Sequence, residues 1–349
     1  MTDKAARKTH RRRGVNFGKF APLGQSPTLI SQSLTLTLTL ALSLTCFAAP
    51  AIAQDAPAPP MNTGMPDLPV GPVGPQLEEP CERACLKGFV DRYLEALIAH
   101  DPARLPLTDD VRFSENTIQL NLGEALWQTA SGLGEKRVYL ADPYSDHAGF
   151  FGTILENGEP RMLAVRLKIR NHEISEIETI VTRAGLLGPF EDGMEELLAN
   201  PIWAQPLTSD ESVPRAEMVR AADLYFDGMD QNTGSIVPFS DQCNRTENGL
   251  QTTNNPNLPE MGGVNIGAMG CLEQFDLMGV GIYSTPERRF WMVDEERGIV
   301  FGMFMFTIKQ QLSVVPIAEA FKIKNGEIYE IEAVGVSGGP LPYGSRSGW

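Results

Sequence analysis

Residues 83–97 read RACLKGFVDRYLEAL, and residues 215–229 read RAEMVRAADLYFDGM. The two stretches align without a gap at a spacing of 132 residues, and the same spacing carries PLTDDVRFSEN (106–116) onto PFSDQCNRTEN (238–248). A later pair, LKIRNHEISEIETIV (167–181) and FKIKNGEIYEIEAVG (321–335), lies 154 residues apart. The chain therefore contains one structural unit twice, and the additional 22 residues lie inside the second copy.

The first copy has the pattern of a helix followed by a sheet. Its apolar residues from Leu86 to Leu97 fall on one face at helical spacing, and the helix should end near Pro102. Alternating runs follow at 136–144, 147–156, 161–170 and 173–182, with turn sequences at Asn157-Gly158 and Asn171-His172. This pattern predicts an α+β unit with an antiparallel meander.

The N-terminus has the features of an export signal. Seven basic residues lie within 1–19, an apolar run spans 34–47, and Ala51-Ile52-Ala53 supplies small residues for cleavage after Ala53. The apolar run is too short and too rich in hydroxyl groups for a membrane span. Residues 54–80 contain eight prolines and are predicted to be a disordered tether. We expect a periplasmic or secreted protein.

Charge and motif content exclude several function classes. The whole chain has a net charge of −15, and removal of residues 1–53 leaves 22 basic and 43 acidic residues, a net charge of −21. This balance argues against a nucleic-acid partner. The sequence lacks the glycine-rich phosphate loops and the metal-binding histidine pair of known enzyme motifs, so we expect neither a cofactor nor a metal.

Four cysteines remain after the predicted cleavage. In an oxidising compartment an even number favours disulfides over a metal site, and four cysteines allow three connectivities. Local pairing is the simplest of these. It joins Cys81 to Cys85 and Cys243 to Cys271, and the second bond would hold the base of the additional segment.

A long helix, a bent antiparallel sheet and the terminal "K-I-x-N-x-x-I-x-E-I-E" hairpin resemble the NTF2-like (SnoaL-like) superfamily. The second copy is similar to a variant found in uncharacterised secreted proteins. The resemblance covers 81–184 and 213–337, with a linker at 185–212, an insert at 254–275 and a disordered tail at 338–349. It implies two cones, each with a pocket between helix and sheet. It also implies an intrachain pseudo-dimer, because such cones commonly pair sheet to sheet. The glycine-rich insert is expected to act as a lid.

Residues that differ between the copies are the better functional candidates, since shared residues are explained by the fold. Arg245 replaces Phe113 and lies two residues before Glu247, so both would share a strand face. The predicted catalytic group is Arg245, Glu247, Tyr225 and Asp223. Steroid isomerases of the resembled superfamily use a tyrosine and a protonated aspartic acid in an apolar cone. The alternative is that Arg245 and Glu247 form a buried ion pair that fixes the insert.

Four further residues are predicted to contact substrate: Asn248, Gln251, Tyr93 and His147. Each also has a structural interpretation, as a turn amide, a packed tyrosine or a hydrogen-bonded histidine. Two functions remain open. The first is a cofactor-independent isomerase, dehydratase or lyase acting on a small apolar or aromatic molecule. The second is a module of the cell envelope that binds a small molecule or a protein without chemistry.

Overall fold

A computed structural model describes residues 81–183, 198–260, 263–277, 283–308, 313–336 and 339–340. All described residues belong to one compact unit. The predicted signal peptide, the tether and linker residues 185–197 lie outside the described residues. Of the predicted tail, Gly339–Pro340 form strand β13, which pairs with β11.

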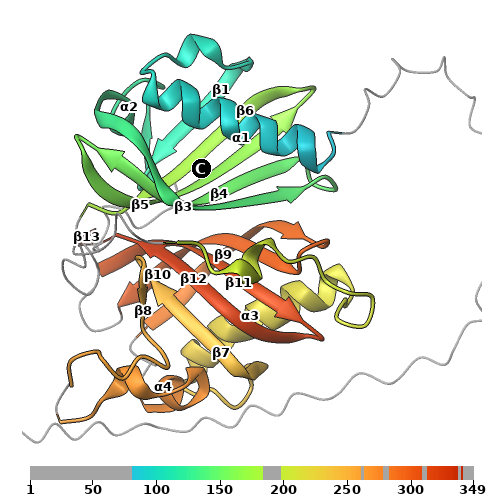
Figure 1. Cartoon of the computed structure of the whole chain (residues 1–349), viewed down its shortest axis with the longest axis vertical. Coiled ribbons are helices and arrows are strands. Elements are labelled where there is room, and N and C mark those ends of the chain that lie inside the picture. Colours follow the sequence, from blue (N-terminus) through green and yellow to red (C-terminus); the bar gives the residue numbers. More distant parts are fainter. Residues whose placement is uncertain are drawn as a thin grey trace, which may run out of the picture. The chain divides into compact units, whose positions relative to one another are not determined.

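The first repeat is a helix on a curved six-stranded sheet (Figure 1). Its elements are α1 (Arg83–Ile98), η1 (Pro102–Arg104), β1 (Leu107–Glu115), β2 (Ile118–Leu120), α2 (Leu126–Thr129), β3 (Ala130–Asp142), β4 (His147–Glu156), β5 (Glu159–Arg170) and β6 (Glu173–Val181). The strand order is β2-β1-β6-β5-β4-β3, and β1 runs parallel to β6. The predicted meander is confirmed for β3 to β6, whereas the parallel strand β1 makes the sheet mixed.

The second repeat has the same architecture. Its elements are α3 (Arg215–Gln231), β7 (Phe239–Glu247), β8 (Leu250–Gln251), η4 (Ile266–Ala268), α4 (Cys271–Leu277), β9 (Tyr283–Asp294), β10 (Ile299–Ile308), β11 (Ser313–Lys324) and β12 (Glu327–Gly335). Its sheet order is β8-β7-β12-β11-β10-β9, with β7 parallel to β12. The short helix η3 (Pro201–Ala204) precedes it. The prediction of two tandem α+β units, each a helix on a curved sheet, is confirmed.

Two-residue turns set the register of the sheets. Asn157-Gly158 joins β4 to β5, Asn171-His172 joins β5 to β6, and Asn325-Gly326 joins β11 to β12. All six residues have positive φ, which is the backbone that a type I′ hairpin turn requires. Because the side-chain period of a strand is two, these turns fix which residues face the helix.

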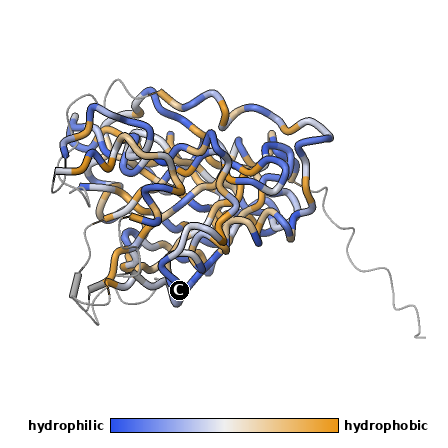
Figure 2. The backbone as a smooth tube through the Cα atoms, turned by 90° about the horizontal axis from the view of Figure 1, so that it is seen from below, coloured by the Kyte–Doolittle hydropathy of each residue, from blue (hydrophilic) through white to orange (hydrophobic). Residues whose placement is uncertain are grey.

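Each sheet has one face toward its own helix and one face toward the other repeat. The helix-side cores contain Leu86, Tyr93 and Phe113 in the first repeat, and Tyr225, Phe304 and Phe321 in the second. A third core combines residues of both sheets, including Phe151 and Phe301, with Trp203 of η3. Hydrophobic stretches alternate with hydrophilic ones along the backbone (Figure 2).

The arginine at the start of each long helix contacts an aspartate at the end of a strand in the other repeat. Arg83, at the start of α1, forms ion pairs with Asp294 at the end of β9. Arg215, at the start of α3, forms ion pairs with Asp142 at the end of β3. Each aspartate also accepts a backbone N–H of the opposite repeat. These contacts explain why the arginine is identical in both copies, and they match the reciprocal interface of a symmetric dimer.

Two further ion pairs also cross between the sheets. Lys136 Nζ lies 2.8 Å from Glu332, and Arg289 lies 2.8 Å from Glu178. The two glutamates occupy the same position of their repeats, 154 residues apart. No helix of the described residues has the length and hydropathy of a membrane span.

Candidate functional site

The predicted pair Arg245 and Glu247 lies inside the second cone. Both residues are on β7, and Arg245 Nε lies 2.9 Å from the Glu247 carboxylate. The Arg245 side chain is only 9% exposed. Tyr225 reaches the same interior from α3 and is buried. Burial is the main cause that raises the pKa of its hydroxyl, and the Glu247 and Glu319 charges add to it while Arg245 opposes it. Three of the four predicted catalytic residues are therefore neighbours.

The insert covers this cluster. Gln274 of α4 accepts a hydrogen bond from Arg245 and donates to the carbonyl oxygen of Thr252 at 2.6 Å. The next residue, Phe275, packs against the Tyr225 ring with centroids 5.1 Å apart. The Cys243–Cys271 disulfide ties the start of α4 to β7. The insert thus holds a polar side chain and an aromatic side chain over the cone interior.

Glu319, on β11, is a member of this cluster that the sequence analysis missed. The sheet register pairs Glu319 with Ala333 of β12, and Ala333 with Glu247 of β7. Directly paired residues point to the same face of a sheet. The two carboxyl groups therefore flank a small alanine on the inner wall of the cone. Glu319 is 2% exposed, and its Oε2 has no hydrogen-bond partner among the described residues.

The environment of Glu319 favours its protonated form. Burial raises its pKa to about 8, and the Glu247 charge adds to the effect while Arg245 opposes it. At neutral pH the second cone therefore contains an ion pair and a neutral carboxylic acid side by side. A buried carboxyl group of this kind, next to a charge partner, is a candidate proton donor.

The first cone lacks this arrangement. Phe113 stands at the position of Arg245, and Val165 stands at the position of Glu319. Tyr93 is buried like Tyr225, and its ring contacts Trp127 of α2 edge to face at 5.6 Å. The equivalent of Glu247 is Glu115, which accepts the backbone N–H of Leu126 at 3.0 Å. In the first repeat these residues support the short helix α2, so Tyr93 has a packing role.

The other predicted catalytic residue, Asp223, lies away from the cluster. It forms an ion pair with Arg288 at 2.8 Å, beside Asp227 and Asp230 on the same helix. Its counterpart Asp91 pairs with Lys87 of its own helix, α1. The structural interpretation of this repeated aspartate accounts for its position on α3.

The predicted amides also make local contacts. Asn248, with φ of 49°, accepts the backbone N–H of Gly335 at 2.9 Å and the hydroxyl of Thr182 at 3.1 Å. Gln251 is exposed and donates to the carbonyl oxygen of Thr253. These contacts hold the β7–β8 turn, and neither amide side chain bonds to Arg245 or Glu247.

His147 lies in the first repeat, on the sheet face toward the second repeat. Its Nδ1 is 3.0 Å from Ser145 Oγ, its Nε2 is 3.2 Å from Arg166, and its ring centroid is 5.8 Å from that of Trp291. Burial, aided by the Arg166 charge, lowers its pKa to about 3. The imidazole is therefore neutral and hydrogen-bonded between the repeats.

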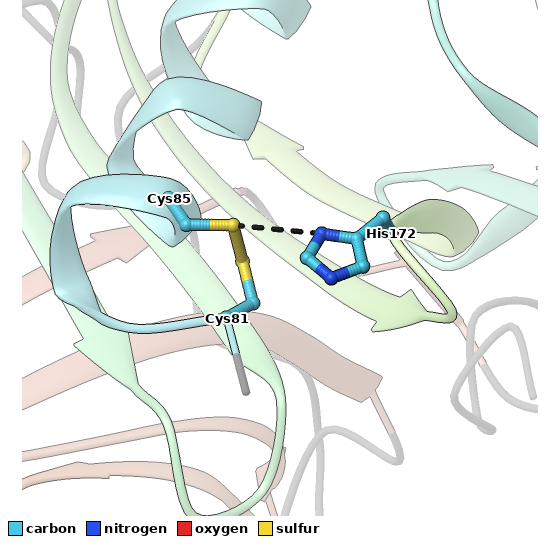
Figure 3. A group of neighbouring side chains, drawn as sticks. All are labelled: Cys81, Cys85 and His172. Carbon is cyan, nitrogen blue, oxygen red and sulfur yellow. Dashed lines mark hydrogen bonds between the residues drawn. A yellow bond between two sulfur atoms is a disulfide. The ribbon is translucent and has the colours of Figure 1, made fainter. Parts of the chain in front are cut away.

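Cys81, Cys85 and His172 form a group with the spacing of metal ligands (Figure 3). The Cys85 sulfur is 3.8 Å from His172 Nδ1. However, Cys81 and Cys85 are joined in a disulfide, and metals bind the thiolate. In this oxidised state the group ties down the start of α1. With the Cys243–Cys271 bond, both locally paired disulfides are present, which is typical of an oxidising compartment.

The family and the solved structures to which this chain is similar carry no activity in their descriptions. Residues 211–335 match the family described as Domain of unknown function (DUF8021). No curated protein matches the chain. A de novo designed protein with a curved β-sheet is 20% identical over 29% of this chain and 88% of its own, with a TM-score of 0.25.

Two natural structures are similar at the same level. An NTF2-like protein of unknown function from Cytophaga hutchinsonii is 14% identical over 28% of this chain and 88% of its own, with a TM-score of 0.23. A protein of unknown function with a cystatin-like fold from Methylobium petroleophilum is 15% identical over 38% of this chain and 83% of its own, with a TM-score of 0.27. Neither description names a substrate.

Proposed function

We propose that the second repeat is a cofactor-independent enzyme domain that transfers protons on a small apolar or aromatic carbonyl compound. The observation that carries this proposal is the buried, unpartnered carboxyl group of Glu319 beside the Arg245–Glu247 pair. Burying polar groups costs free energy unless they are satisfied. The second cone retains three ionisable groups among aromatic side chains, and the first repeat has apolar residues at two of these positions. This difference favours a chemical role.

The cluster has the components of an enolisation site. The Glu247 carboxylate would take a proton from the carbon next to the carbonyl, and the electrons of that C–H bond would move onto the carbonyl oxygen. Arg245 and the protonated Glu319 would stabilise the resulting enolate oxygen. Return of the proton at another carbon gives isomerisation, and loss of a group from the β-carbon gives a dehydration or lyase reaction. This chemistry requires no cofactor.

Access to the cluster would require movement of the insert. Phe275 packs on both Tyr225 and Phe239, and Gln274 closes the polar end. A ligand ring would replace Phe275 among the surrounding aromatic side chains. Residues 254–275 would then act as the lid, held at one end by the Cys243–Cys271 disulfide. Export of the protein, proposed from residues 1–53, would allow both disulfides to form.

A second candidate function is ligand binding without chemistry. The mutual pairing of Arg245 with Glu247 and its bond to Gln274 favour this alternative, because a satisfied ion pair also stabilises the insert. The two functions differ in whether a bound carbonyl compound exchanges its carbon-bound hydrogen with solvent.

Hydrogen exchange tests the proposal without knowledge of the natural substrate. The purified protein is incubated in D₂O with a panel of aryl ketones that includes 1-indanone, and deuterium incorporation is followed by NMR. We expect saturable acceleration, reduced by on the order of 100-fold in Glu319→Gln. Glu330→Gln is the matched control, because Glu330 is also buried with its pKa raised to about 7 but lies on β12 beside Asn200 and Asn244.

Three outcomes separate the candidates. Loss of exchange in Glu319→Gln with retention in Glu330→Gln supports the enzyme. Saturable ketone binding without exchange would replace it with the binding function. Equal losses in both variants would contradict a specific role for Glu319.

A further inference from the structure

A cavity of about 320 Å³ lies along the edge strand β3 of the first repeat. Its apolar wall includes Val138 and Leu140 of β3 and Trp203 of η3. Helix α1 contributes one side, and Arg297, from the turn between β9 and β10, contributes another. This volume is at the lower end of the range for small-molecule sites, so it suits a molecule with a single ring.

Four cationic side chains line this cavity, although the protein carries a net charge of −15. Two of them have carboxylate partners: Arg83 pairs with Asp294, and Lys87 pairs with Asp91. The other two are Arg137 and Arg297. Within the described ranges, no carboxylate forms an ion pair with either guanidinium.

Both arginines donate to backbone carbonyl oxygens. Arg137 donates from Nε to the carbonyl oxygen of Gly134 at 2.9 Å. Arg297 donates to the carbonyl oxygen of Tyr139 at 3.5 Å, and its Nε is buried without a hydrogen-bond partner in the described part of the chain. A buried unpartnered donor costs free energy that an incoming acceptor would recover.

In the second repeat the corresponding cation is neutralised by carboxylates. The sequences EKRVYLAD (135–142) and ERRFWMVD (287–294) align. In β9 the pairing with β10 shifts by one residue at Trp291. A one-residue slip moves every side chain to the other face of the sheet, so Arg289 takes the face of Lys136 and Arg288 takes the face of Arg137. Arg289 consequently pairs with Glu178 as Lys136 pairs with Glu332.

The other two basic residues, Arg137 and Arg288, face the helix of their own repeat. Their ion pairs differ. Arg288 lies against α3 and forms ion pairs with Asp223, Asp227 and Asp230 at 2.7–2.8 Å. Arg137 is its counterpart beside α1. Of the described carboxylates, none pairs with it. Carboxylates thus neutralise Arg288 in the second repeat, whereas Arg137 in the first repeat remains available to a ligand in the cavity.

We propose that this cavity binds a small organic acid with an aromatic or branched apolar body. Its carboxylate forms charge-assisted hydrogen bonds with Arg137 and Arg297, and its body packs against Trp203 and the β3 side chains. Guanidinium groups match a carboxylate in charge and geometry, and the apolar wall excludes a fully hydrated anion. This site is separate from the proposed reaction site in the second cone.

Isothermal titration calorimetry with benzoate tests the proposal on the purified full protein. Benzamide, which has the same shape without the charge, is the ligand control. We expect benzoate binding to be about tenfold weaker in Arg137→Gln. Arg220→Gln removes the same charge from an exposed arginine outside the cavity and should bind benzoate as the unmodified protein does.

The named results either support or overturn the site. Benzoate binding that depends on Arg137 and exceeds benzamide binding supports it. Equal binding of benzoate and benzamide, unchanged binding in Arg137→Gln, or no benzoate binding overturns it. Glu319→Gln must leave benzoate affinity unchanged; a loss there would place the ligand in the second cone instead. Because Arg137 is exposed and unpaired among the described residues, its variant should fold normally.

Discussion

The two cones share one backbone plan but have opposite interiors. The first contains Phe113 and Val165 at positions where the second contains Arg245 and Glu319. Both retain the tyrosine of the long helix and the glutamate at the end of the following strand. Since the first cone has apolar residues at these two positions, the shared backbone plan does not itself require Arg245 and Glu319. Three predictions on stability test this comparison.

Removal of the Cys243–Cys271 disulfide should have the largest effect on stability. This bond spans 28 residues, whereas Cys81–Cys85 spans four. Chain-entropy estimates give roughly 3–4 kcal/mol for the longer loop and about 2 kcal/mol for the shorter. Urea denaturation of Cys243→Ser/Cys271→Ser and of Cys81→Ser/Cys85→Ser measures both losses. A larger loss from the shorter loop would contradict the expectation that loop length sets the contribution of each disulfide.

Arg245→Met should lower the free energy of unfolding by about 3 kcal/mol, because it leaves Glu247 without its buried partner. Arg288→Met is the matched control in the same repeat. Its three aspartate partners are partly exposed, so water can solvate their charges when Arg288 is removed. We expect the free energy of unfolding to fall by about 1 kcal/mol or less. Equal losses in urea denaturation would contradict the distinction between the cone interior and the outer face of α3.

Glu319→Gln should change how stability depends on pH. The carboxyl group has a pKa of about 8 in the folded protein and an ordinary value of 4.5. Between these values the unfolded chain has released a proton that the folded protein retains, so rising pH destabilises the folded state. The slope is about 1.4 kcal/mol per pH unit for one proton.

The glutamine variant lacks this proton, so its stability relative to the unmodified protein should rise from pH 5 to pH 8. Comparing the two proteins cancels the contributions of His147 and Glu330, which titrate in overlapping ranges. Parallel pH profiles would show that Glu319 is ionised in the folded state.

The sequence predicted the fold because the repeat and the hairpin turns are local signals. Helix spacing from Leu86 to Leu97 and the Asn-Gly and Asn-His turns identified α1 and strands β4 to β6 correctly. The parallel pairing of β1 with β6 was not predicted, since it joins distant segments that carry no turn between them.

The site was predicted in part. Arg245, Glu247 and Tyr225 followed from comparison of the copies, whereas Asp223 was assigned to the catalytic group although its side chain pairs with Arg288. Glu319 was missed because it follows the insert within the apolar run SVVPIAEAF, where only the 154-residue spacing aligns it with Val165. Extending that alignment two residues toward the N-terminus would have found it. The difference between Arg137 and its counterpart Arg288 could not be predicted, because matching the two residues depends on a register shift in β9.

The reciprocal arginine–aspartate contacts have a consequence for how the halves could specialise. Two subunits of a homodimer carry every substitution twice, so the cost of burying a charge is also incurred twice. In a single chain, the two repeats stay together at any dilution, because the linker fixes the effective concentration of one repeat near the other. One half can then retain an apolar interior that supports the other, while a destabilising polar group is introduced only once.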